Sequence, residues 1–371
     1  MAIPDCTAYT EGSTVLFVPR ASLEGGRSPV FFNKRGCLTR DISVLLARRT
    51  KVDTFLDVMC GLGARGLRVA NEARAERIVL NDINPDAIAL AYLSARENNL
   101  TGVEFQSEGA NALLALGDYR EGYDTVDLDP YGTPAPFVSN AVLSTRSGGV
   151  LAVCATDGAN LCGNRPKALE RLYAAFNRDR MSKKETGLRI LVGFVVRSAA
   201  IHGMAARPVL CYNYGEYFRC HFSLERSSSA CSNLLNRVGY LVGCEHTYYS
   251  AAPYCTVCHA SASGGPLWTG GLCDAVLVGE LLGDAGRTTL ASRYTTSLLE
   301  ELACECSMNF QYIDLPLLMK NTGASVPKKS SVILGLRDLG YRASSTHFSH
   351  TAIRTDAPRT IVAKVCRELT G

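Results

Sequence analysis

The segment DTVDLDPYGTP, from Asp124 to Pro134, ends a buried-looking strand with a carboxylate, a proline, an aromatic ring and a glycine. An exocyclic amine of a nucleobase is a weak nucleophile because its lone pair is delocalised into the ring. A carboxylate can orient such an amine and take up its proton as a new C–N bond forms. An aromatic face beside it can hold a base that has left its stack. The turn therefore predicts methylation of a base amine, with Asp129 and Tyr131 as the reacting pair and Pro130 fixing the turn.

A glycine-rich stretch, DVMCGLGARG, runs from Asp57 to Gly66. It follows a predicted strand and opens a predicted helix, so its glycines permit a sharp turn and close approach of the backbone to a ligand. Asp82 ends the next strand, where an acid hydrogen-bonds ribose hydroxyls in both NAD and S-adenosylmethionine (SAM) enzymes. The polar turn SEGANALL and the DPYGTP turn favour SAM over NAD. The structural alternatives are that Asp82 caps a helix and that Asp129 only forms a turn.

Strands and helices alternate from about residue 50. Apolar runs predict strands at 54–59, 77–82, 123–129 and 148–156, and helical patterns predict helices at 63–73, 85–99 and 136–146. Segments 189–203 and 220–226 add later strands or a helix. This spacing indicates a parallel, doubly wound, Rossmann-like α/β sheet, the fold of class I SAM-dependent methyltransferases. Such a sheet brings Asp82 and Asp129 to one edge, because each ends a predicted strand.

The length of 371 residues favours two domains. We expect a methyltransferase domain with an N-terminal substrate segment at 1–226. A smaller α+β domain, expected to bind tRNA, follows at 227–371, with a cysteine-bearing loop at 244–273 and a winged-helix-like end. The start of the chain lacks the pattern of a signal peptide, and no apolar run is long enough to span a membrane. We therefore expect a cytoplasmic protein without a membrane partner, with its fifteen cysteines mainly reduced.

Basic residues gather in three runs, although the net charge is only +4. Residues 20–51, 165–189 and 327–367 each carry eight Lys or Arg against two, three and two acids. Runs of this kind are often plain solvated faces. Three of them in one chain favour contacts with a phosphate backbone.

Five segments, taken in order, resemble the archaeal and eukaryotic family of tRNA (guanine-26-N2)-dimethyltransferases. DPYGTP is similar to that family's D-P-F-G-S-P, and FFNKRGCLTRD to its F-Y-N-P-x-M-x-x-N-R-D. ATDGANLCGNRP, GPLWTGGLCD and THFSHTAIRTDAP resemble three further motifs of the family. The resemblance runs from near residue 11 to residue 358. Thr39, Lys34 and His350 depart from the family pattern, and none of them is a proposed catalytic group.

The resemblance implies transfer of methyl groups from SAM to N2 of guanosine 26 in tRNA, giving first mono- and then dimethylguanosine. Arg40, assisted by Arg65, would bind the methionine carboxylate of SAM, and Asp129 would accept the proton. Tyr131 and either Phe31 or Phe32 would sandwich the guanine. The implied cofactor site comprises Arg40, Asp57, Gly61, Gly63, Arg65, Asp82, Glu108, Ala110 and Asn111, and a monomer is expected.

Many members of that family hold a structural zinc ion through four cysteines just before G-P-L-W. Here Cys255 and Cys258 form a C-x-x-C pair, which supplies half of a tetrahedral site. Upstream, Cys244 is followed by Thr247 where a second cysteine would be needed. Cys273 is the expected fourth ligand, and His246 or His259 are the other candidates. The alternative is a set of reduced thiols without metal.

Two other functions stay open at this stage. SAM-dependent methylation of another base amine, in rRNA guanine or DNA adenine, uses related turns, although those read D-P-P-Y or N-P-P-Y. A non-catalytic tRNA-binding protein is the second alternative. The intact glycines and the presence of Asp82 and Asp129 argue against it.

Overall fold

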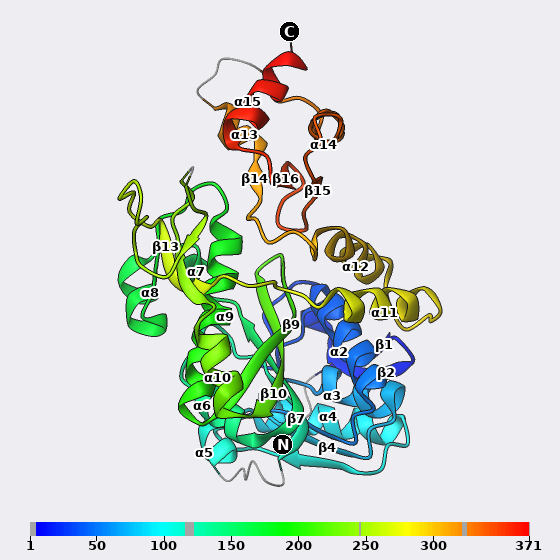
Figure 1. The fold of residues 1–371 in the computed structure, drawn as a ribbon. Helices are drawn as coiled ribbons and strands as arrows, with labels where there is room; N and C mark the ends of the chain where they lie inside the picture. The colour runs from blue at the N-terminus through cyan, green and yellow to red at the C-terminus, as the bar shows by residue number, and fades with distance from the viewer. Residues whose placement is uncertain (1–4, 116–121, 245, 321–324, 371) are drawn as a thin grey trace.

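A seven-stranded sheet forms the centre of the molecule in the computed structural model, which describes residues 5–115, 122–244, 246–320 and 325–370 (Figure 1). The spatial order of its strands is β5 (Val103–Gln106), β4 (Arg77–Asn81), β3 (Thr54–Asp57), β6 (Tyr123–Leu128), β7 (Thr145–Ala155), β10 (Tyr217–Arg226) and β9 (Met204–Tyr214). The first five pair in parallel, whereas β10 runs antiparallel to both β7 and β9. The chain order reverses between β3 and β6, the position at which such sheets open a ligand crevice.

Helices cover both faces of this sheet, as the alternation of side chains along its strands requires. Phe55 and Ile78 pack in one core with α2 (Cys37–Thr50), α3 (Ala64–Arg68) and α4 (Pro85–Glu97), and α3 continues as a π-helical turn over Val69–Ala73. Their neighbours Leu56 and Val79 pack in a second core with α6 (Val138–Ser144) and α9 (Lys183–Ile201). The predicted doubly wound, class I fold is confirmed.

Each predicted strand and helix of the sheet region occurs within a few residues of its expected place. The segment 189–203 lies in α9, and 220–226 lies in β10. The sequence did not predict β5, β9 or the N-terminal hairpin of β1 (Cys6–Glu11) and β2 (Thr14–Pro19). In β5 every second residue is exposed, so its four residues present a weak apolar signal.

A second, four-stranded sheet adjoins the large one. Its order is β12 (Tyr249–Ser250), β11 (Val238–Leu241), β13 (Gly264–Trp268) and β8 (Phe176–Asn177). Short helices lie around it and at the edges of the large sheet: α1 (Arg20–Leu23), α5 (Ala110–Ala115), α7 (Gly158–Leu161), α8 (Pro166–Tyr173) and α10 (Ser228–Leu235). Because β8 precedes residue 226, the small sheet joins the two expected domains, and the boundary at 226/227 stays a prediction.

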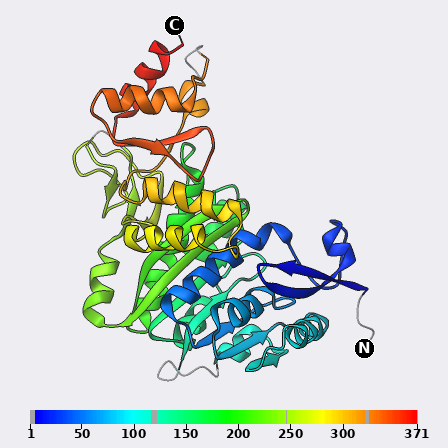
Figure 2. The same ribbon diagram turned by 90° about the vertical axis from the view of Figure 1, so that its right-hand side faces the viewer.

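The C-terminal part forms its own unit at one end of the molecule (Figures 1 and 2). Helices α11 (Ala275–Gly286) and α12 (Arg293–Glu305) pack on α2 of the large domain. Beyond them come β14 (Ile313–Asp314), α13 (Leu315–Met319), α14 (Lys329–Asp338), β15 (Ala343–Ser345), β16 (Ala352–Thr355) and α15 (Arg359–Glu368). Strand order β14-β16-β15, with two helices before the hairpin, is the arrangement expected of a winged helix. No helix in the described ranges is both long and apolar enough to cross a bilayer.

Candidate active site

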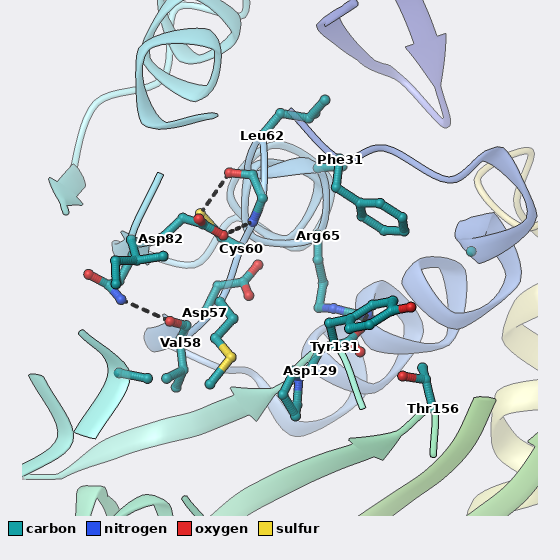
Figure 3. Close-up of a pocket in the computed structure, with 18 of the residues that line it drawn as sticks. Phe31, Asp57, Val58, Cys60, Leu62, Arg65, Asp82, Asp129, Tyr131 and Thr156 are labelled. Atoms are coloured by element: carbon teal, nitrogen blue, oxygen red, sulfur yellow. Dashed lines mark hydrogen bonds and ion pairs between the residues drawn. The ribbon is translucent and has the colours of Figure 1, made fainter. Parts of the chain in front are cut away.

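A cavity of about 860 Å³ opens where the carboxyl ends of β3, β4, β6 and β7 meet (Figure 3). The residues that line it come from these four strand ends, from the turn before α5, from segment 31–40 and from the β9–β10 turn. All but one of the predicted cofactor, catalytic and base-binding residues are among them: Phe31, Phe32, Arg40, Asp57, Gly61, Arg65, Asp82, Glu108, Ala110, Asn111, Asp129, Pro130 and Tyr131.

Gly63, the remaining one, shapes the loop instead of lining it. Its φ of +78° is a conformation that residues with a Cβ rarely adopt, and a Cβ there would lie 2.9 Å from Leu80 Cδ1. At Gly66 a Cβ would lie 2.3 Å from Leu80 Cδ2. These glycines let α3 start directly against β4. The loop backbone is thereby free to face the cavity.

Asp82 closes one end of the cavity. Its Oδ2 accepts a hydrogen bond from the Gly61 amide at 2.8 Å, and its Oδ1 accepts one from the Asn84 amide at 2.9 Å. Asn81, which the sequence did not single out, bonds the Val58 carbonyl and both backbone groups of Glu108. Asn81 thus ties the loops that follow β3 and β5 together. The expected ribose and adenine residues lie side by side as a result.

Arg40 lines the cavity, but a neighbouring carboxylate already binds its guanidinium. Its Nε and Nη2 each donate to Glu11 at 2.6 Å, and Nη2 also donates to the Asn33 carbonyl at 3.1 Å. Among the hydrogen bonds of the described residues, none involves Arg40 Nη1. That nitrogen lies next to Gly36, where a Cβ would be only 2.7 Å away. Nη1 is therefore the part of Arg40 available to a carboxylate ligand.

Arg65 lines the cavity next to Asp129. Its Nη2 donates to Asp129 Oδ2 at 2.5 Å, and its Nη1 bonds the Thr39 carbonyl and Ser43 Oγ. Its Nε lies 3.4 Å from Asp127 Oδ1. With these partners Arg65 orients Asp129, and its implied contact with the methionine carboxylate stays a prediction.

Asp129 lies in a buried layer of charges below the cavity. Arg219, fully buried in β10, forms an ion pair with Asp127, and its Nη1 lies 3.9 Å from Asp129 Oδ2. Burial alone would raise the pKa of Asp129, but Arg65 and Arg219 outweigh burial and hold this pKa below the ordinary value. Burial and the Asp127 carboxylate raise the pKa of Asp57 to about 8. Asp129 is thus held in its ionised form where it borders the cavity.

Hydrogen bonds from neighbouring residues hold the turn that follows Asp129. Gly132 N donates to Thr156 Oγ1 at 2.7 Å, and Thr156 N donates to the Gly132 carbonyl at 2.9 Å. Tyr173 contacts Thr133 through its hydroxyl at 2.8 Å and donates to Asp157 at 2.9 Å. These bonds fix the backbone of the turn. Its aromatic ring, on Tyr131, stays 98% exposed at the mouth of the cavity.

The structure distinguishes the two phenylalanines that the sequence left as alternatives. Phe31 is 68% exposed and lines the cavity. Phe32 is buried, with its ring centroid 5.5 Å from that of Tyr9 and under the Arg40 guanidinium. Figure 3 shows the rings of Phe31 and Tyr131 on the same side as Asp129, away from Asp82. A planar group held between Phe31 and Tyr131 would lie next to the Asp129 carboxylate.

The cysteine loop brings together four side chains that could hold a metal ion. Sγ of Cys244, Cys255 and Cys258 and a ring nitrogen of His246 all lie within 4.8 Å of one another. The prediction of Cys273 as fourth ligand is wrong. Its Sγ lies 3.5 Å from the Cys211 carbonyl, near the start of α11, because the chain passes through β13 before reaching it.

Sequence reasoning missed several residues of the site. Asp127 lies two positions before Asp129 in the predicted strand 123–129, a spacing that puts both side chains on the same side and could have indicated Asp127. Arg219 interrupts the apolar run YFRCHF, a signal of a buried pair. Asn33 and Tyr217, which also line the cavity, carried no such signal.

A doubly wound sheet with this cavity at its switch point, an acid after β4 and a carboxylate–aromatic turn after β6 defines the class I methyltransferases that act on base amines. The model of the family described as "N2,N2-dimethylguanosine tRNA methyltransferase" matches residues 12–367. The chain belongs to this family.

Known members of the family are similar over their whole length. The tRNA (guanine(26)-N(2))-dimethyltransferase of Methanospirillum hungatei is 37% identical over 95% of this chain and 97% of its own. That of Methanoculleus marisnigri is 34% identical over 97% and 99%. Among solved structures, Trm1 from Pyrococcus horikoshii in complex with SAM superposes with a TM-score of 0.87 at 31% identity. That match covers 97% of this chain and 99% of Trm1.

Proposed function

We propose that this protein transfers methyl groups from SAM to the exocyclic N2 of guanosine 26 in tRNA, giving mono- and then dimethylguanosine. The observation that carries the proposal is the placement of the ionised Asp129 carboxylate beside two exposed rings, those of Phe31 and Tyr131, at the mouth of the cavity. Family membership and full-length similarity to enzymes with this activity support it.

Some residues of the cavity would bind SAM, and others would bind the guanine. Asp82 would accept hydrogen bonds from the ribose hydroxyls, and Arg40 Nη1 would pair with the methionine carboxylate. SAM supplies a methyl group on a positively charged sulfur. Phe31 and Tyr131 would hold the guanine after it leaves its stack, and Asp129 would accept a hydrogen bond from N2–H and so aim the nitrogen lone pair at the methyl carbon.

In each transfer, the N2–C bond forms as the S–C bond breaks, and S-adenosylhomocysteine leaves as a neutral thioether. The nitrogen becomes a cation at that moment and turns strongly acidic. Its proton passes to Asp129, which releases it to solvent at the cavity mouth. A carboxylate with a lowered pKa suits this role, since it is ionised before attack and gives the proton up readily afterwards.

The test is transfer of labelled methyl from SAM to unmodified tRNA transcripts with guanosine or adenosine at position 26. We expect label only with G26, and we expect mass analysis of the digested nucleosides to show mono- before dimethylguanosine. Label that persists with A26 would overturn the site, and label on rRNA or DNA but not tRNA would favour the other base amines. SAM binding without transfer to any RNA would favour a non-catalytic role.

We further propose that Cys244, His246, Cys255 and Cys258 hold a structural zinc ion. Their ligand atoms are close enough for one tetrahedral site, and three thiolates with one imidazole form a common structural zinc set. The amides of Cys258 and Val257 point at Cys255 Sγ and lower the pKa of this thiol to about 7, which favours the thiolate that binds zinc. Zinc takes no part in the methyl transfer.

Binding to tRNA through the C-terminal unit, a monomeric state and a cytoplasmic location complete the proposal. The exposed basic residues on α14 and α15 support the first of these. The other two are expectations from the sequence.

A further inference from the structure

His347 connects the C-terminal unit to the large sheet. It lies between β15 and β16, and only 2% of its side chain is exposed. Its Nε2 accepts a hydrogen bond from the backbone amide of Asn213, in β9, at 3.2 Å. Its Nδ1 contacts the Glu305 carboxylate of α12, which can only accept. The ring therefore carries its proton on Nδ1 and uses the lone pair of Nε2 to hold the sheet.

Asn213 in turn connects His347 to the wall of the cavity. Its side-chain amide donates to the carbonyls of Tyr217 at 3.0 Å and Gly215 at 3.4 Å, which closes the β9–β10 turn. Tyr217 from this turn lines the cavity, and its hydroxyl accepts a hydrogen bond from Asn33 Nδ2 at 2.7 Å. Asn33 follows Phe31 and Phe32 in the chain. A continuous series of hydrogen bonds thus runs from His347 to the segment that carries the base-binding ring.

The other side of His347 is rigidly held. Arg354 of β16 donates to Glu305 at 3.0 Å and, through both Nη atoms, to Glu185 of α9 at 3.0 and 2.9 Å. Burial would raise the pKa of Glu305, but the contact with His347 and the Arg354 guanidinium outweigh it and lower this pKa. The carboxylate that orients His347 is therefore ionised and can accept the hydrogen bond from Nδ1–H. The imidazole cannot turn away from Asn213 without breaking a buried charged contact.

We propose that His347 is a positioning residue for the base-binding side of the active site. Through Asn213 and the β9–β10 turn it sets the place of Asn33, and with it the exposed ring of Phe31. At the SAM end, Glu11 holds Arg40 by two hydrogen bonds at 2.6 Å, and the Asn33 carbonyl accepts one further bond from Arg40 at 3.1 Å. The link thus couples the C-terminal unit to insertion of the base more than to cofactor affinity. This inference rests on the proposed function.

Two isosteric variants separate the contacts of His347. In His347→Asn the side-chain amide lies near the position of Nδ1, so the contact with Glu305 is kept and the acceptor for Asn213 N–H is removed. In His347→Gln the amide reaches the position of Nε2, and its oxygen can accept from Asn213. We expect His347→Asn to lower kcat for tRNA about tenfold and His347→Gln to stay within about threefold of wild type. KM for SAM should change by less than about twofold in either, because Glu11 still holds Arg40.

A second variant and a measurement independent of activity complete the test. Tyr217→Phe removes the hydroxyl that holds Asn33. If His347 acts only through this hydroxyl, a double variant that also carries His347→Asn should lose no more kcat than the more impaired of the two single variants. Hydrogen exchange of the Asn213 amide should accelerate in His347→Asn and not in His347→Gln.

Several outcomes would overturn the link. These are equal losses of kcat in His347→Asn and His347→Gln, additive losses with Tyr217→Phe, or unchanged exchange at Asn213 in His347→Asn. Absence of methyl transfer by the wild-type protein would count against the proposed function. The exchange experiment would still decide whether His347 holds the turn.

Discussion

A single carboxylate, Asp129, has to be ionised while it is nearly surrounded by protein. Arg65 and Arg219 make this possible, and they are themselves fixed by Thr39, Ser43 and Asp127. The pKa of the neighbouring Asp57 is raised to about 8 by burial and by Asp127, so the two carboxylates that line the cavity have pKa values shifted in opposite directions. The surroundings of the two carboxylates thus favour the ionised form of Asp129 and the protonated form of Asp57, as in other sites where two acids have separated pKa values.

Replacing Asp129 with Asn keeps the size of the side chain and an acceptor oxygen but removes the base. We expect the single-turnover rate of methyl transfer to fall by about 10²–10⁴. SAM affinity measured by calorimetry should stay close to that of wild type, because Asp82 and Arg40 are held by their own partners, Gly61, Asn84 and Glu11, and not by Asp129. A variant with near wild-type turnover would remove Asp129 from the role of proton acceptor.

We expect Arg219 to set the pH below which the rate of methyl transfer falls. In the proposed reaction, transfer needs the Asp129 carboxylate, and a lowered pKa keeps it ionised as the pH falls. Arg219→Gln removes one of the two cations, so the pKa of Asp129 rises and the acid limb of kcat/KM should move to higher pH by about one unit or more. Arg77→Gln, which breaks an exposed ion pair with Glu104, is the control and should not move it. An acid limb at the wild-type pH in Arg219→Gln would contradict the assigned role.

Phe31 is exposed and its neighbour Phe32 is buried, so we expect Phe31 to stack on the base and Phe32 to stabilise the fold, which matched substitutions can test. Phe31→Ala removes an exposed ring, so we expect a large loss of kcat/KM for tRNA with little change in the free energy of unfolding. Phe32→Ala opens a space in the core beside Tyr9 and should cost about 3–5 kcal/mol of stability. Denaturant unfolding and steady-state kinetics on both variants test the pair. Reversed results would return the choice of base-stacking residue to Phe32.

The strands and helices that carry these residues could be predicted from the sequence where neighbouring residues alone determine them. Buried parallel strands such as β3 and β4 are continuous apolar runs, and Pro85 marks the start of α4. Contacts between distant segments could not be read. The pairing of Arg219 with Asp127, of Asn213 with His347 and of β8 with β13 depends on how β9, β10 and the small sheet fold back.

The cysteine loop gives the clearest case at the scale of one element. We expect one zinc ion per chain in the purified protein, measured by elemental analysis. Cys255→Ser should lose it and unfold at lower temperature, since binding of a structural metal contributes to folding. Cys273→Ser is the matched control and should keep the metal. Equal zinc content in both variants, or none in wild type, would exclude the proposed site.

Across the whole molecule, the catalytic cavity and the C-terminal unit are joined by buried charged contacts. Arg354 connects β16 to α9 and α12, and Asp41 of α2 accepts hydrogen bonds from the amide of Ser292 and the hydroxyl of Thr295 at the start of α12. Buried polar contacts of this kind fix orientation more than they add stability. A tRNA bound to the far unit would therefore meet the cavity at a defined place.

The basic residues at the start of α14 offer the most direct test of that arrangement. Lys328 and Lys329 lie where a winged helix presents its second helix to nucleic acid, and Lys328 is exposed. If they neutralise phosphates, the double change to Glu should weaken tRNA binding. It should also flatten the plot of log K against log salt by roughly 0.7–0.9 for each phosphate that is no longer neutralised. Arg77→Glu in β4 should leave both quantities unchanged, and SAM binding should be the same in all three proteins. An unaltered salt slope in the double variant would show that this basic run is an ordinary solvated face. The tRNA would then have to reach the cavity over another surface. The basic run at 165–189 is the next one to test.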